Sequence, residues 1–145
     1  MWGKILIPID GSQYGEKAIA LAADLSKQFK SKVTLLFINV PFSQIYAHEG
    51  IFVPDYSDEL EEQGGKILAG GVKKAESHGL KVDTLMVTGN AAEQIANMAN
   101  DEKYDLVIIG SRGLSRAKAF LLGSVSDKVI RYSHCPVLVV KLSVS

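Results

Sequence analysis

The chain has 145 residues, of which 47% are hydrophobic and 22% are charged, and its 16 basic residues balance its 16 acidic ones. This balance gives no electrostatic footprint for nucleic acid or an anionic membrane surface, and the one cysteine excludes an internal disulfide and a multi-cysteine metal site. No apolar stretch reaches about 18 residues and no signal peptide is evident, so we expect no transmembrane helix and a cytoplasmic location.

Short apolar runs alternate with helical patterns, which predicts one α/β domain over residues 1–145. The expected strands are Lys4–Ile9, Val33–Val40, Leu80–Val87, Tyr104–Ile109 and Pro136–Leu142. The expected helices end near Phe29, His78, Glu102 and Ser133, and the last of them begins at Ser124. Such alternation indicates a doubly wound, five-stranded parallel sheet with right-handed crossovers and helices on both faces.

The middle of the chain leaves two alternatives open. Residues Pro41–Ser57 show no clear hydrophobic period and are expected to form a long connection. Gly64-Gly65 and Gly70-Gly71 lie inside the next expected helix, where each glycine costs up to about 1 kcal/mol. Either these glycines pack closely against a neighbouring element, or the helix is broken.

Glycines and hydroxyl residues follow the strand that ends at Ile109 and open the last helix. Glycine lets the backbone approach a ligand closely, and the unpaired N–H groups of a helix start favour an anion. The candidate residues are Gly110, Arg112, Gly113, Gly123, Ser124, Val125 and Ser126. The alternative is that Ser124 is only an N-cap and Gly123 only a turn residue.

Asp10 follows the first strand at its carboxyl end, where parallel sheets bind ligands. Its carboxylate could accept hydrogen bonds from ribose hydroxyls, or it could satisfy the backbone donors of Gly11 or Ser12 in a turn. Pro8 lacks the N–H group that a strand interior needs, so it indicates an edge strand or an irregularity.

Two segments, KILIPIDGSQYGEKAIALAADLSKQF and GSRGLSRAKAFLLGSVSDKVIRYSHCPVLVVK, resemble the universal stress protein family. The resemblance implies the adenine nucleotide alpha hydrolase-like fold with strand order 3-2-1-4-5. It also implies ATP, AMP or ADP as ligand, with Mg²⁺ on the phosphates. The implied contacts are Pro8 and Val40 for adenine, Ile109 for base or sugar, Asp10 and Gly110 for ribose, and Gly113 with Gly123–Ser126 for phosphates.

No general base is well placed in this pattern, so we expect a stress-response binding or signalling module with little or no catalysis. One alternative is a slow ATPase or nucleotidyl-transferring enzyme of the same fold, although Asp10-Gly11-Ser12-Gln13 is not a Ser-Gly-Gly-rich pyrophosphate loop. Another is an interaction protein in which the nucleotide is purely structural. The resemblance further implies a homodimer through the apolar edge strand Pro136–Leu142, because such edges are usually covered or paired.

Overall fold

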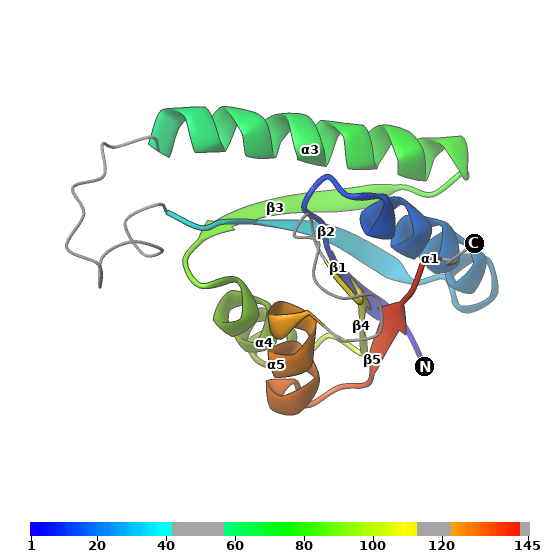
Figure 1. Cartoon of the computed structure of the whole chain (residues 1–145). Helices are drawn as coiled ribbons and strands as arrows, with labels where there is room; N and C mark the ends of the chain where they lie inside the picture. The colour runs from blue at the N-terminus through cyan, green and yellow to red at the C-terminus, as the bar shows by residue number, and fades with distance from the viewer. Residues whose placement is uncertain (42–56, 113–122, 143–145) are drawn as a thin grey trace.

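The computed structural model describes residues 1–41, 57–112 and 123–142, which form a parallel sheet with helices on both faces (Figure 1). In chain order the elements are β1 (Lys4–Pro8), α1 (Gln13–Phe29), β2 (Lys32–Asn39), α3 (Ser57–Ser77), β3 (Val82–Thr88), α4 (Ala91–Asp101), β4 (Leu106–Gly110), α5 (Ser124–Tyr132) and β5 (Val137–Val140). The five strands are all parallel, in the order β3-β2-β1-β4-β5. The predicted fold class and strand order are confirmed.

The sheet is apolar on both of its faces because helices cover both. Ile5 and Ile7 of β1 belong to the core cluster under α1 and α3, whereas Leu6 belongs to the cluster under α4 and α5. All three side chains are fully buried. A strand that is buried on both faces reads as a continuous apolar run, which is why the inner strands lack polar alternation.

Two expected strands begin two residues too early, at Leu80 and Tyr104, and those boundaries are wrong. The backbone N–H groups of Leu80 and Tyr104 donate to the carbonyls of Ala75 and Ala99, each at 2.9 Å. Both residues therefore close the preceding helix, and they are apolar because they are buried there. The last strand is also shorter than expected and covers Val137–Val140.

Helix α3 is continuous through both glycine pairs, so the broken-helix alternative is wrong. One glycine of each pair faces the sheet. A Cβ on Gly64 would lie 2.6 Å from ring carbons of Phe37, and a Cβ on Gly71 would lie 2.8 Å from Cδ1 of Leu35. The other glycine of each pair has open space at its Cβ position. Close packing therefore explains one glycine of each pair but not its neighbour.

Pro8 ends a central strand, so the edge alternative is wrong and the irregularity is real. The N–H group of Ile9 donates to the carbonyl of Leu36 on β2 at 2.9 Å. Because successive residues of a strand bond to opposite sides, Pro8 lacks its donor on the side of β4. The pairing of β1 with β4 ends at Leu6 and Val107. The two strands therefore lose their ladder before their carboxyl ends.

Candidate functional site

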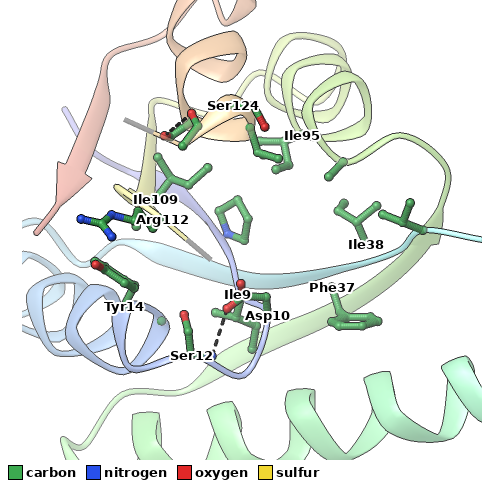
Figure 2. A pocket seen from close by; sticks show the side chains of 18 residues that line it. Ile9, Asp10, Ser12, Tyr14, Phe37, Ile38, Ile95, Ile109, Arg112 and Ser124 are labelled. Carbon is green, nitrogen blue, oxygen red and sulfur yellow. Dashed lines mark hydrogen bonds between the residues drawn. The ribbon is translucent and has the colours of Figure 1, made fainter. Parts of the chain in front are cut away.

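A pocket of about 260 Å³ opens at the carboxyl ends of β1, β2 and β4 (Figure 2). Its walls come from these strand ends, the first turn of α1, and the beginnings of α4 and α5. It lies where the β1–β4 ladder has stopped, which is also the point at which the strand order reverses. Open α/β sheets bind ligands at this kind of position.

The pocket brings together ten of the eleven residues that were predicted to bind a ligand. They are Pro8, Asp10, Val40, Ile109, Gly110, Arg112, Gly123, Ser124, Val125 and Ser126. Gly113 lies outside the described residues. These residues come from segments far apart in the sequence, so the shared wall is a property of the fold. Their contacts with a ligand stay predictions.

The pocket has an apolar wall, which Ile38 of β2, Ile95 of α4 and Ile109 of β4 form within one core cluster, and Val40 lines the pocket just after β2. Val40 is not part of β2, which ends one residue earlier, at Asn39. The carbonyl of Asn39 accepts from the N–H of Gly89 at 3.0 Å on the β3 side. The main-chain groups of Val40 therefore face the β1 side, beyond the last β1–β2 pair. They are positioned to meet the edge of a flat ligand.

Asp10 takes part in a turn and also lines the pocket. Its Oδ1 accepts a hydrogen bond from the N–H of Ser12 at 3.0 Å, so the turn exists (Figure 2). The carboxylate is half-buried at the pocket wall, and this is its one recorded hydrogen bond within the described residues. The turn therefore fixes the carboxylate while leaving Oδ2 available to a ligand.

The N-terminus of α5 forms the pocket wall across from Asp10. Its N-cap is Gly123, so the alternative that Ser124 is only an N-cap is wrong. The N–H of Gly123 donates to the carbonyl of Ser111 at 2.6 Å, which joins the start of α5 to the segment after β4. Ser124 and Val125 are exposed in the first helical turn, where N–H groups have no intrahelical acceptor. These groups and the helix dipole suit an anion.

The hydroxyl of Ser126 is directed into the protein. Ser126 is 2% exposed, and its Oγ lies 3.0 Å from the carbonyl oxygen of Gly123 and 3.3 Å from that of Ser111. It therefore ties the chain after β4 to the start of α5. This role supports the shape of the anion-facing wall without requiring a direct contact between hydroxyl and ligand.

The sequence patterns missed several lining residues, among them Tyr14 and the apolar pair Ile38 and Ile95. A Cβ on Gly110 would overlap Cβ of Tyr14, so the glycine lets α1 lie close to the end of β4. Ile38 could have been found, because it lies two residues before Val40 and shares its side of the strand. Tyr14 and Ile95 carried no local signal, since only the packing of α1 and α4 brings them to the pocket.

A resident metal ion, a membrane span and a reactive thiol find no support among the described residues. Among them, no three His, Cys, Asp or Glu side chains are grouped to hold a metal ion, and no helix has the length and apolarity needed to cross a bilayer. Burial raises the pKa of the Cys135 thiol, with smaller opposing effects from backbone hydrogen bonds. A raised pKa leaves less thiolate at neutral pH, so Cys135 is a poor nucleophile.

The model of the universal stress protein family matches residues 1–141. Universal stress protein YxiE of Bacillus subtilis is 35% identical over 149 residues, covering 97% of this chain and 100% of that protein. The structure of MJ0577 of Methanocaldococcus jannaschii has a TM-score of 0.79 at 35% identity, covering 100% of this chain and 99% of that one. A universal stress protein in complex with cAMP has a TM-score of 0.70 at 25% identity, covering 98% of each chain. This chain therefore belongs to the universal stress protein family.

Proposed function

We propose that this protein binds an adenine nucleotide in the pocket at the strand ends and acts in the cytoplasm as a binding or signalling module of the stress response. The observation that carries the proposal is the pairing of an apolar wall with a helix N-terminus across one carboxyl-end pocket. A universal stress protein that is 25% identical has been solved with cAMP, which contains adenine, ribose and phosphate.

The base is proposed to lie at the apolar end, between the side chains of Ile38, Ile95 and Ile109. Pro8 would border it, since the β1–β4 ladder has already ended there. The outward main-chain groups of Val40 would pair with the polar edge of adenine. This arrangement combines apolar contact area with a few fixed polar groups, as small-molecule sites generally do.

The sugar and phosphates are proposed to lie toward α5. Asp10 would accept hydrogen bonds from ribose hydroxyls through Oδ2, beside the close-packed Gly110. The phosphates would meet the N–H groups of Ser124 and Val125, and the half-buried Arg112 at the end of β4 would add a guanidinium. Gly113 is proposed to join this phosphate site.

Mg²⁺ is proposed to bind with ATP or ADP through the phosphate oxygens. Asp10 is the one carboxylate among the described lining residues, and one of its oxygens already accepts from Ser12. Mg²⁺ commonly keeps several waters and uses one or two carboxylates with substrate phosphates. The donor set therefore fits an ion held mainly by the nucleotide, which would neutralise phosphate charge when bound.

Binding is favoured over catalysis by the side chains that line the pocket. Its described lining has no histidine, lysine, glutamate or cysteine, and the carboxylate of Asp10 is held in a turn beside the sugar site. A general base must lie within hydrogen-bond reach of the proton that it removes. The ATPase alternative would require multiple ATP turnovers per minute that Asp10→Ala abolishes.

The test of this function is calorimetry of the purified protein with AMP, ADP and ATP, together with mass spectrometry of any ligand released on denaturation. We expect one saturable adenine-nucleotide site per chain and no comparable heat with UMP, which cannot fill the apolar end in the same way. A titration that is silent to all three adenosine compounds would overturn the proposal.

We also propose a homodimer through the edge strand β5, within the segment Pro136–Leu142. β5 lies at one edge of the sheet, and Leu138 is 39% exposed there. Leu138→Lys is expected to shift sedimentation from dimer to monomer, because a charge on an edge strand opposes strand pairing. Ile130→Lys is the control, since Ile130 is equally apolar and 41% exposed but lies on α5. A wild-type monomer at micromolar concentration would refute the dimer.

A further inference from the structure

A second cavity, of about 310 Å³, lies between α1 and α3, the two helices on the same face of the sheet (Figure 1). The first turns of α1 form one wall, and a single stripe of α3 from Gln63 to Lys74 forms the other. It adjoins the nucleotide pocket, because Ile9, Ser12 and Gly15 line both. The other residues that line the second cavity do not line the nucleotide pocket.

Four of the residues that line the cavity are glycines: Gly11, Gly15, Gly70 and Gly71. Three of them have local reasons to be glycine. Gly11 has φ +90°, a Cβ on Gly15 would lie 3.1 Å from Cγ2 of Ile9, and Gly71 packs on the sheet. A Cβ on Gly70 would meet nothing within 4 Å. Gly70 therefore lowers helix stability by about 1 kcal/mol relative to alanine and keeps the cavity open.

The chemistry of the cavity is apolar at its floor and charged at its rim. Its floor is Ile9, Ile19 and Ile67, and its rim is Glu16, Gln63, Lys66 and Lys74. Lys66 lies 3.7 Å from Glu62 in a pair whose side chains are both largely exposed. Lys74 is half-buried, and no ion pair is recorded for its Nζ within the described residues. Lys74 is therefore the rim cation most available to a ligand.

We propose that this cavity is a second binding site, for a small molecule with an apolar body and one anionic group. The body would lie on the three isoleucines, and the anion would face Lys74. Glu16 on the opposite wall would oppose a second negative charge, which limits the ligand to a single anionic group. The volume of the cavity, about 310 Å³, is at the lower end of the range for small-molecule sites. The proposal is independent of nucleotide binding.

The probe for this site is 8-anilinonaphthalene-1-sulfonate, which carries an aromatic body and one sulfonate. The full-length protein is titrated with the probe in saturating AMP, which occupies the nucleotide pocket, and fluorescence is recorded. We expect one saturable site in the wild type and its loss in Gly70→Leu, whose side chain would fill the cavity without a clash at Cβ. Gly65→Leu is the matched control, because Gly65 also has open space but does not line the cavity.

The charge is tested by Lys74→Gln, which we expect to weaken probe binding about two- to fivefold, since a partly exposed ion pair contributes little. Lys73→Gln, at the exposed neighbouring position, should leave binding unchanged. Near-UV circular dichroism is recorded for every variant, because a protein with loosened packing would bind the probe without a specific site. Equal probe binding by wild type and Gly70→Leu, or an equal loss in Gly65→Leu, would overturn the proposal. If AMP does not bind, titration without nucleotide remains decisive, because Gly70 does not line the nucleotide pocket.

Discussion

Asp10→Asn is expected to weaken AMP binding about 30-fold, which corresponds to about 2 kcal/mol, while leaving the fold intact. Hydrogen bonds to a charged acceptor contribute about 1.5–3 kcal/mol, whereas neutral ones contribute about 0.5–1.5 kcal/mol. Asparagine retains Oδ1, which can still accept from the N–H of Ser12, but it replaces the proposed ribose acceptor Oδ2 with an amide donor. The substitution therefore separates the ligand role of Asp10 from its role in the turn.

Calorimetry measures the affinity, and thermal unfolding of the nucleotide-free protein shows whether the turn survives. Asp10→Ala is the contrasting variant, because it removes the Ser12 acceptor as well and should lower the melting temperature. Titration with 2′,3′-dideoxyadenosine monophosphate identifies the atoms involved. Wild type should prefer AMP to this analogue, and Asp10→Asn should lose most of that preference. Undiminished preference in Asp10→Asn would place the ribose elsewhere in the pocket.

The predictable parts of this site are those with a local cause. A glycine and an aspartate at strand ends carry a local signal, so the sequence predicts Asp10 and Gly110 as candidates, although the ligand role of Asp10 depends on the family resemblance. The order of the strands came from family resemblance, because nothing in one strand specifies its neighbour. Tyr14 could not be found from sequence, since it reaches the pocket only through the packing of α1 against Gly110.

The errors also have local physical causes. The apolar runs that follow Leu80 and Tyr104 predict that both residues belong to strands, yet their N–H groups close helices. Ser124 has the chemistry of an N-cap, but the chain turns one residue earlier, at Gly123. An apolar residue indicates burial, and a serine indicates that a helix starts nearby. Neither determines the residue at which a strand or helix begins.

The double substitution Gly64→Ala with Gly71→Ala is expected to lower the free energy of unfolding by about 2 kcal/mol, because overpacking costs about 1–3 kcal/mol at each site. A Cβ on Gly64 would lie 2.6 Å from two ring carbons of Phe37, and a Cβ on Gly71 would lie 2.8 Å from Cδ1 of the fully buried Leu35. These clashes outweigh the roughly 0.5–1 kcal/mol per site that alanine gains in helix propensity. Urea unfolding of nucleotide-free protein measures the change, since bound ligand would mask it.

The neighbouring double substitution, Gly65→Ala with Gly70→Ala, is the matched control and should have the opposite sign. It makes the same chemical change on the same helix, but an added Cβ meets nothing within 4 Å at either position. Relief from the glycine cost is expected to raise the free energy of unfolding by about 1–2 kcal/mol. Because the two pairs differ in what the new methyl groups meet, a difference in sign attributes the effect to packing of α3 on the sheet. Equal changes in both double variants would show that helix propensity alone determines the effect, and that α3 lies farther from Phe37 and Leu35 than this structure places it.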